Sequence, residues 1–193
     1  RVVDIVLVLM GAPFVLPLVL VLAFLVALDG GNPFYLQDRV GKGGRIYRIW
    51  KLRSMLPDAD QRLVEYLAND PAARAEWDHC QKLRRDPRIT RIGNFLRRYS
   101  LDELPQLWNV LRGDMSLVGP RPMMPSQRAL YPGQAYYSLR PGVTGLWQVA
   151  ARNESSFAAR AGYDSEYDRM LSLTADLRLL LATVRVVTRG TGC

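Results

Sequence analysis

The sequence predicts a mainly α-helical protein with a few short strands (α+β), in which an apolar N-terminal segment precedes a compact cytoplasmic domain. Three observations lead to this fold class. One long run carries no charge, several segments repeat apolar residues at helical spacing, and β-type residues occur only in short stretches between glycine and proline. We assign residues 1–31 to a membrane-inserted segment and residues 32–193 to a membrane-associated cytoplasmic domain.

The apolar run extends from Ile5 to Leu28, and as a helix it would be about 36 Å long, enough to cross a hydrocarbon core of about 30 Å. Gly11, Pro13 and Pro17 interrupt it, and an interior proline removes a helical hydrogen bond. The pattern therefore leaves two alternatives open: a kinked helix that crosses the bilayer, or a re-entrant hairpin of two half-helices. Basic residues gather directly afterwards, from Arg39 to Arg53, which places the following domain on the cytoplasmic side by the positive-inside rule.

The next segments alternate between short β-type stretches and amphipathic helices. Asn32–Met55 surrounds a glycine-rich turn and predicts a short hairpin or an extended segment. Pro57–Asp86 predicts one or two charged helices, broken near Pro71. Asp86–Ser100 predicts an amphipathic helix in the membrane interface, with its arginines facing lipid phosphates. Asp164–Arg189 predicts a further amphipathic helical segment, which lies on the membrane or covers the core.

Two segments punctuated by glycine and proline carry candidate binding residues. In Gly113–Pro122 the prolines on both sides of Arg121 stiffen the backbone, which suits an arginine that must hold a phosphate in fixed geometry. In Arg140–Val149 the segment presents Arg140, Trp147 and Gln148. A flat aromatic ring beside an amide could hold a nucleobase, and a tryptophan packed in the core is an equally ordinary interpretation.

The charge of the chain indicates a partner rich in phosphate. The formal net charge is +8, and all but three of the 26 basic residues are arginine. Arginine binds phosphate and carboxylate in planar, bidentate geometry, so nucleic acid, anionic lipid and a diphosphate substrate all suit this composition. The sequence contains no recognisable nucleic-acid-binding element, and we therefore expect no nucleic-acid partner.

The segment SLDELP, from Ser100 to Pro105, holds two adjacent carboxylates among several arginines. One interpretation is a capping box, in which Ser100 and Glu103 satisfy backbone donors at a helix start. The other is a nucleophile, Asp102, beside a metal ligand, Glu103. Backbone N–H groups, the helix dipole and the arginines would favour a bound phosphate there and keep the carboxylate ionised.

Taken together, the sequence motifs of this chain resemble those of one family, the bacterial sugar transferases, also called small monotopic polyprenyl-phosphate phosphoglycosyl transferases. The similarity covers essentially the whole chain, and its order is specific. It comprises Asp4 ahead of the proline-broken apolar segment, QDR (Gln37–Arg39), KLRSM (Lys51–Met55), SLDELP (Ser100–Pro105), NVLRGDMSLVGPRP (Asn109–Pro122) and RPGVTGLWQV (Arg140–Val149). The charged insert from Pro57 to Asp86 is similar to the branch that starts exopolysaccharide synthesis with galactose or glucose.

The resemblance implies a re-entrant membrane segment and a specific reaction at the cytoplasmic face of the bacterial inner membrane. The enzyme would transfer a hexose-1-phosphate from a UDP-sugar to undecaprenyl phosphate and release UMP through a covalent phosphosugar–aspartate intermediate. Anionic membrane lipids would be further partners. Many relatives carry serine before the proline that breaks the helix, whereas Leu16 precedes Pro17 here, so Gly11, Pro13 and Pro17 must set the bend.

The resemblance also implies roles for individual residues. Asp102 would be the nucleophile, Glu103 its Mg²⁺-associated partner, and both would be metal ligands. Arg121 would grip phosphate, and Arg97 would lie near the lipid phosphate. The remaining residues carried over to the substrate site are Lys51, Arg53, Asp114 and Asp164.

A different class of function is a non-enzymatic, arginine-rich scaffold that binds anionic lipid at the membrane surface. It would explain the charge and the apolar run, but not the stiffened GPRP segment or the adjacent carboxylates. An activity that depends on Mg²⁺ separates the two hypotheses. The sequence leaves open which UDP-sugar is used and whether the chain forms a homo-oligomer.

Overall fold

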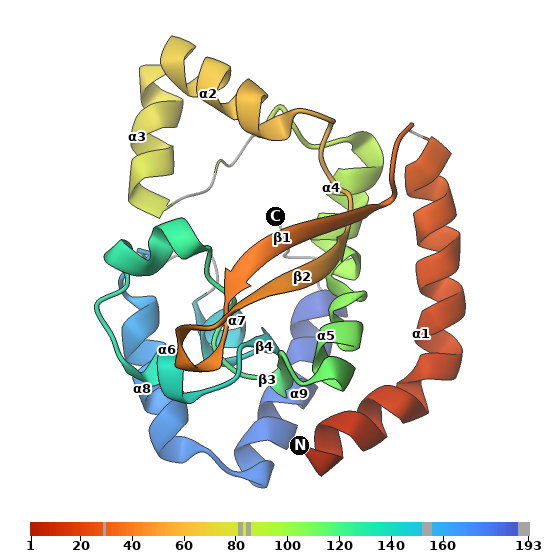
Figure 1. Ribbon diagram of the computed structural model, residues 1–193, viewed down its shortest axis with the longest axis vertical. Helices are drawn as coiled ribbons and strands as arrows, with labels where there is room; N and C mark the ends of the chain where they lie inside the picture. Colours follow the sequence, from red (N-terminus) through yellow and green to blue (C-terminus); the bar gives the residue numbers. More distant parts are fainter. Residues whose placement is uncertain (29, 81–82, 84–85, 152–155, 189–193) are drawn as a thin grey trace.

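The computed structural model describes residues 1–28, 30–80, 83, 86–151 and 156–188. It is mainly helical with two small two-stranded sheets, as the sequence predicts. Figure 1 shows one long helix, α1, along one side, a helical hairpin projecting at one end, and the β1–β2 hairpin between them. The helices of residues 135–138 and 160–170 lie on the side opposite α1, whereas those of residues 91–98 and 106–112 lie beside it (Figure 1).

Helix α1 (Val2–Leu28) contains Pro13 and Pro17 and changes direction along its length (Figure 1). An interior proline lacks a helical hydrogen bond and kinks the helix, so these residues account for the bend. In the part of the chain that the structure describes, α1 is the helix long and apolar enough to cross a membrane. Because a bent helix suits both crossing and re-entry, the re-entrant hairpin stays a prediction.

One face of α1 packs against the rest of the protein, and polar contacts hold both of its ends. Val8 belongs to a buried cluster with Tyr47 and Val110, and Val26 to a second one with Leu52 and Leu96. Near the N-terminus, the Asp4 carboxylate accepts hydrogen bonds from Ser116 Oγ at 2.9 Å and from the Leu117 N–H at 3.2 Å. Only 17% of the most apolar stretch of α1 is buried in the structure, whereas the core helix of a water-soluble protein is mostly buried.

Strands β1 (Phe34–Val40) and β2 (Ile46–Leu52) pair antiparallel, with Phe34 opposite Leu52, which confirms the predicted hairpin. The glycine turn η1 (Lys42–Gly44) joins them. In β2 the side chains alternate between two faces, and Tyr47 and Ile49 enter the core beside α1 and α5. The same alternation directs Lys51 towards the interior of the protein.

Helices α2 (Ala59–Asn69) and α3 (Pro71–Cys80) form the projecting hairpin. The break at Asp70 agrees with the prediction of two charged helices separated near Pro71. The amphipathic segment that follows is shorter than predicted. It forms α4 (Arg91–Arg98), whose N-cap Thr90 accepts a hydrogen bond from the Gly93 N–H at 2.9 Å.

The two stiff segments pair with each other. After α5 (Gln106–Arg112), the first forms β3 (Ser116–Val118), which pairs in parallel with β4 (Gly142–Thr144) from the second. A Cβ on Gly119 would lie 2.2 Å from the Arg140 carbonyl oxygen, and one on Gly142 would lie 2.1 Å from the Gly119 nitrogen. Glycine is required at both positions because the two backbones approach too closely for a side chain.

The C-terminal third covers the second sheet. It consists of η3 (Pro125–Leu130), α6 (Ala135–Ser138), α7 (Leu146–Ala150), α8 (Arg160–Met170) and α9 (Leu173–Thr188). The predicted continuous segment from Asp164 is thus two helices, and the first begins earlier, at Arg160. Residue 189, its predicted end, lies outside the described residues. Val118, Leu139, Tyr167 and Leu179 form the core beneath α9.

Candidate active site

Asp102 and Glu103 lie on a short turn, η2 (Leu101–Glu103), between α4 and α5. The capping-box interpretation is wrong, because Ser100 makes no capping hydrogen bond and has a left-handed backbone with φ 55°. Helix α5 begins only at Gln106, with Pro105 as its N-cap residue. The two carboxylates therefore precede the helix instead of capping it.

Lys51 reaches this acidic pair from β2. Its Nζ lies 2.7 Å from Glu103 Oε1 and 3.8 Å from Asp102 Oδ2. Asn109 of α5 holds the strand in position, because its side chain accepts a hydrogen bond from the Trp50 N–H at 3.0 Å and donates one to the Arg48 carbonyl oxygen at 2.7 Å. The buried amide thus pairs with the edge of β2 as a neighbouring strand would.

Arginines from two other elements complete the surroundings of the pair. Nη2 of Arg121, which follows β3, lies 3.6 Å from Glu103 Oε1. Arg97 of α4 and Gln148 of α7 line the same pocket, which has a volume of about 290 Å³. The pocket has a polar end at Asp102 and an apolar wall on α9, formed by Leu180, Val186 and Val187. Its shape and lining suit a ligand with a charged head and an apolar tail.

The Asp102 carboxyl is buried, with the residue only 6% exposed. Burial raises the pKa of Asp102 above its usual value, and the charge of Glu103 adds to this effect. Lys51, Arg97 and Arg121 act in the opposite direction and favour the ionised form. The charge state of Asp102 therefore depends on the basic residues that surround it.

The pocket brings together six of the residues predicted from the sequence: Lys51, Arg97, Asp102, Glu103, Arg121 and Gln148. Three others lie elsewhere. Arg53 donates to the Val26 carbonyl oxygen at 3.0 Å and to that of Gly30, at the end of α1. Asp114 lies 3.5 Å from Arg112 Nε, after α5, and Arg140 is exposed beside a separate cavity.

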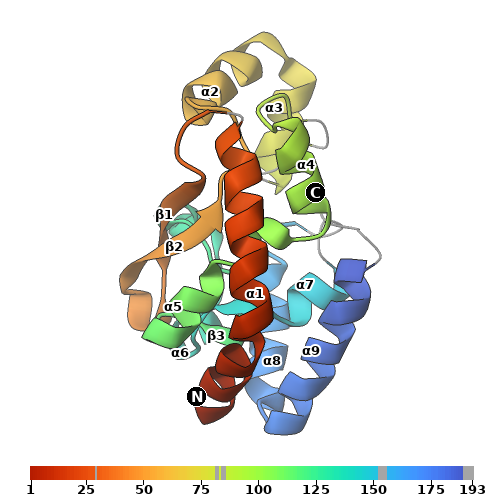
Figure 2. The same cartoon turned by 90° about the vertical axis from the view of Figure 1, so that its right-hand side faces the viewer.

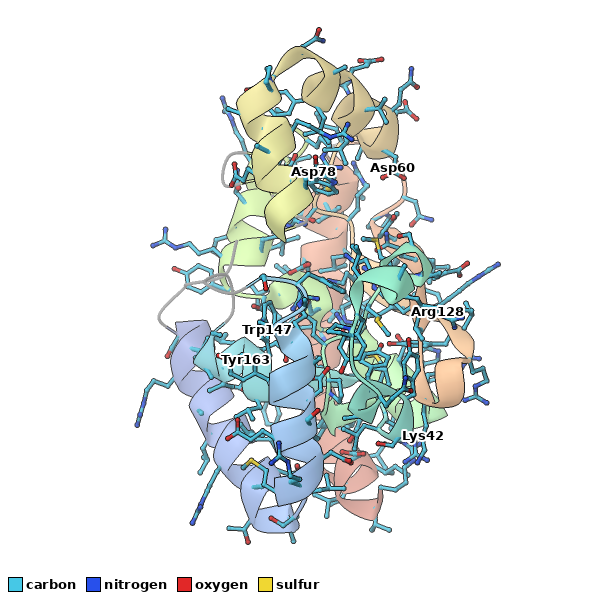
Figure 3. All side chains as sticks on the ribbon, turned by 90° about the vertical axis from the view of Figure 1, so that its left-hand side faces the viewer. Lys42, Asp60, Asp78, Arg128, Trp147 and Tyr163 are labelled. Atoms are coloured by element: carbon cyan, nitrogen blue, oxygen red, sulfur yellow. The ribbon has the colours of Figure 1, made fainter. Side chains whose placement is uncertain are left out.

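Asp164 is buried in a neighbouring cluster that sequence reasoning did not assemble. Its Oδ2 accepts a hydrogen bond from the Tyr131 hydroxyl at 2.8 Å, and burial raises its pKa to about 6. Arg160, four residues earlier on α8, lies over the ring of Trp147, with 4.2 Å between the guanidinium carbon and the ring centre. Figure 3 shows Trp147 at the end of α8 nearest the α2–α3 hairpin. Arg160 stands in no sequence motif that could have indicated this position.

The donor set of the site suits Mg²⁺ when phosphate is also present. Among the described residues no group of three or more His, Cys, Asp or Glu side chains could hold a metal ion. The adjacent pair Asp102 and Glu103 supplies two carboxylates, and Mg²⁺ is usually held by one or two carboxylates together with substrate phosphates. The residues therefore fit a metal that arrives with a phosphorylated substrate.

Comparisons with known proteins show which family this chain is similar to. The sequence model described as "Bacterial sugar transferase" matches residues 1–190. The UDP-galactose-lipid carrier transferase of Erwinia amylovora is 50% identical over 179 residues, which cover 92% of this chain and 38% of the relative. The undecaprenyl-phosphate galactose phosphotransferase of Salmonella typhimurium is 47% identical over 178 residues, covering 91% of this chain and 37% of the relative.

A shorter relative matches over most of its own length. The exopolysaccharide production protein ExoY of Rhizobium meliloti is 42% identical over 175 residues, which cover 90% of this chain and 77% of the relative. The chain thus spans less than two fifths of the first two relatives and about three quarters of ExoY.

Proposed function

This chain belongs to the bacterial sugar transferase family, and we propose that it transfers a hexose-1-phosphate from a UDP-sugar to undecaprenyl phosphate and releases UMP. The relatives named for galactose make UDP-galactose the first donor to test. The observation that carries the proposal is the buried Asp102 carboxylate, with Glu103 partly buried beside it, in a pocket whose wall on α9 is apolar. A water-soluble diphosphate donor and a lipid acceptor both need such a pocket.

In the first half-reaction, the Asp102 carboxylate attacks the β-phosphorus of the UDP-sugar. The bond from this phosphorus to the bridging oxygen breaks, and that oxygen leaves with UMP. The product is an acyl phosphate that links the sugar to Asp102. Lys51, 3.8 Å from Asp102 Oδ2, favours the ionised nucleophile, and Arg121 offsets the negative charge of the donor.

In the second half-reaction, a phosphate oxygen of undecaprenyl phosphate attacks the same phosphorus. The acyl-phosphate bond breaks, Asp102 becomes a carboxylate again, and the sugar leaves on a lipid diphosphate. Arg97 lines the pocket and would bind the acceptor phosphate. The apolar α9 wall, with Leu180, Val186 and Val187, would contact the polyprenyl chain.

Asp102 and Glu103 would hold Mg²⁺ together with the donor phosphates. When bound, the ion would neutralise charge on the diphosphate that otherwise repels the approaching carboxylate. Glu103 also lies 2.7 Å from Lys51 Nζ, so the protein itself holds this carboxylate in place.

Exposed apolar side chains on three helices support membrane association. Phe14 and Phe24 of α1, Phe95 of α4, and Leu181 and Val184 of α9 are all more than half exposed. Figure 2 shows α1, α4 and α9 on the same side of the molecule. We propose that this side lies in the cytoplasmic leaflet of the bacterial inner membrane, with α1 re-entrant, so that the acceptor reaches Asp102 from the bilayer.

The test is UMP release by the chain in nanodiscs that contain anionic lipid and undecaprenyl phosphate, with Mg²⁺ and a panel of UDP-sugars. We expect Asp102→Asn to lose at least about 1,000-fold in rate while Asp78→Asn, in exposed α3, keeps the wild-type rate. With a UDP-sugar alone, wild type should gain the mass of one sugar phosphate and Asp102→Asn should not. Wild-type UMP release by Asp102→Asn, or anionic-vesicle binding without any turnover, would contradict the proposal.

A further inference from the structure

A second group of basic residues lies next to the pocket, around Trp147. Arg160 is the first residue of α8, and its guanidinium carbon lies 4.2 Å from the centre of the Trp147 ring and 4.5 Å from that of Phe157. The guanidinium of Arg121 also lies over Trp147, at 5.8 Å. Arg39 of β1 is close enough that its charge and that of Arg121 lower the pKa of Arg160.

This group carries more positive charge than the described part of the chain neutralises. No described carboxylate lies within ion-pair distance of Arg160 or Arg39. Arg160 Nε is buried without a hydrogen-bond partner among the described residues. Asp164, a described acid whose charge raises the pKa of Arg160, already accepts a hydrogen bond from the Tyr131 hydroxyl.

The energetic cost of this arrangement requires an explanation. Burial and the neighbouring Arg121 lower the pKa of Arg160 to about 9, and the same two causes lower the pKa of Arg39. Arg39 and Arg160 are partly buried, and withdrawing a cation from water is unfavourable unless a counter-charge accompanies it. Here the cations repel one another as well. A bound anion would relieve both effects, and guanidinium groups bind phosphate in bidentate geometry.

Arg121 connects this group to the nucleophile, because its Nη2 lies 3.6 Å from Glu103 Oε1. Neither Arg39 nor Arg160 lines the pocket that contains Asp102. Arg97 lines that pocket from α4 and also has no described carboxylate within ion-pair distance. Arg97 on α4 and the group around Trp147 are thus two separate sets of basic residues, and the reaction proposed above brings two phosphate-bearing substrates to Asp102.

We propose that Arg39, Arg121 and Arg160 form the site for the phosphate that stays on the departing nucleotide, with Arg121 shared between this site and the Asp102–Glu103 pair. The inference rests on the proposed function, since it divides a donor diphosphate between two neighbouring sites. The sugar-bearing phosphate is next to Asp102, and the nucleotide phosphate is next to Arg160. Arg97 is then left for the acceptor phosphate.

The first experiment measures binding without turnover. Calorimetry gives the affinity of the chain in nanodiscs for UMP and for uridine, which lacks the phosphate. We expect Arg160→Gln and Arg39→Gln each to weaken UMP binding roughly 10- to 100-fold and to leave uridine binding unchanged. Arg160→Lys, which keeps the charge, should recover part of the affinity. Arg74→Gln, on the exposed α3 surface, is the matched control and should bind UMP as wild type does.

The second experiment is kinetic and separates the two phosphates. Arg160→Gln should raise KM for the UDP-sugar and weaken product inhibition by UMP, without changing KM for undecaprenyl phosphate. Arg97→Gln should give the reverse pattern. Thermal unfolding within a few degrees of wild type shows that a variant is folded.

Two results would overturn the inference: unchanged UMP affinity in folded Arg160→Gln and Arg39→Gln, or an equal loss of UMP and uridine binding. These two results can be distinguished from a failure of the proposed function. A wild-type chain that releases no UMP from any UDP-sugar refutes the reaction, whereas an active wild type with unaltered UMP binding in both variants refutes only this phosphate site.

Discussion

Lys51 Nζ lies 2.7 Å from Glu103 Oε1, so a strand and a turn separated by about fifty residues meet through this ion pair. The contact is partly shielded from water, because the two side chains are 19% and 17% exposed. Screening is weaker there than at the surface, and the lysine charge also acts on Asp102 at 3.8 Å. Lys51 is therefore the group with the largest opposing effect on the burial that raises the pKa of Asp102.

We predict that Lys51→Met shifts the acidic limb of the UMP-release pH profile to higher pH by roughly 1 to 2 units. The nucleophile must be ionised, and burial already raises the pKa of Asp102. Removing the lysine raises this pKa further, so activity is lost at a higher pH than in wild type. The measurement is kcat/KM for the UDP-sugar against pH. Lys51→Arg keeps the charge and should keep the wild-type limb, and an unshifted limb in Lys51→Met would exclude this role.

Gly93 is the point where α4 touches the chain after β2. A Cβ at this position would lie 1.9 Å from the Ser54 carbonyl oxygen, which also accepts a hydrogen bond from the Thr90 N–H at 3.1 Å. Gly93→Ala must therefore push α4 away and should destabilise the protein by about 1–3 kcal/mol. Because α4 carries Arg97, we also expect a higher KM for undecaprenyl phosphate.

Gly162 provides the matched control, since a Cβ there meets no atom within 4 Å. Gly162→Ala lies within α8 and should be neutral or stabilise by up to about 1 kcal/mol. Both variants are compared by thermal unfolding followed by circular dichroism. Equal unfolding temperatures for the two alanine variants would show that the contact with Ser54 does not constrain α4.

Asn109 tests how strongly β2 depends on a side chain from α5. Asn109→Leu leaves the Trp50 N–H and the Arg48 carbonyl oxygen without their partner and should cost about 2–3 kcal/mol. Asn109→Asp keeps the acceptor but loses the donor, and it introduces a negative charge where Nδ2 lies 3.4 Å from Asp114 Oδ2. We therefore expect the aspartate variant to become less stable as pH rises.

Asn69 of α2 is the control, because its exposed side chain makes one local hydrogen bond to Glu65. Asn69→Ala should change stability by less than about 0.5 kcal/mol. Chemical denaturation of the three variants in the same detergent provides the measurement. An Asn109→Leu protein as stable as Asn69→Ala would contradict the proposed support of β2.

Local signals in the sequence predicted several elements correctly. The charge-free run predicted α1, the glycine turn predicted the β1–β2 hairpin, and Pro71 predicted the break between α2 and α3. These features depend on neighbouring residues, on a period of 3.6 or 2, and on what proline and glycine do to the backbone.

Long-range pairing could not be predicted in the same way. Strands β3 and β4 have three residues each and come from separate segments, so neither carries a readable alternation. The sequence indicated only stiffness around Gly119 and Gly142, whereas the glycines are needed because one backbone lies against the other. The start of α5 after Pro105 was likewise missed, because the preceding residues form a separate turn fixed by tertiary contacts.

The residues of the candidate site likewise fall into those that the sequence indicated and those that it did not. The motif resemblance selected the residues that line the pocket, including Lys51, Arg97 and Arg121. It did not indicate Arg160, whose position follows from the packing of α8 against α7. It also assigned Arg53 to the substrate, while in the structure this side chain binds the carbonyl oxygens at the end of α1.

Asp164 links stability to pH. Burial raises its folded-state pKa to about 6, against an ordinary value of 3.8, so the folded protein binds the proton more tightly than the unfolded chain. The resulting stabilisation is complete below pH 3.8 and is lost as pH rises through about 6. Asp164→Asn has no such proton. Its stability relative to wild type should therefore improve by roughly 3 kcal/mol between pH 4 and pH 7.

The measurement is the difference in free energy of unfolding between wild type and Asp164→Asn across that range. Asp60→Asn is the control, because it also removes one carboxylate but from the exposed surface of α2. Tyr131→Phe provides a second test. The tyrosine hydroxyl lowers the pKa of Asp164, so removal of this hydroxyl should raise the pKa. The loss of stability should then occur at higher pH. A difference between wild type and Asp164→Asn that does not change with pH would mean that this carboxyl titrates alike in the folded and unfolded chain, despite its burial beside Tyr131.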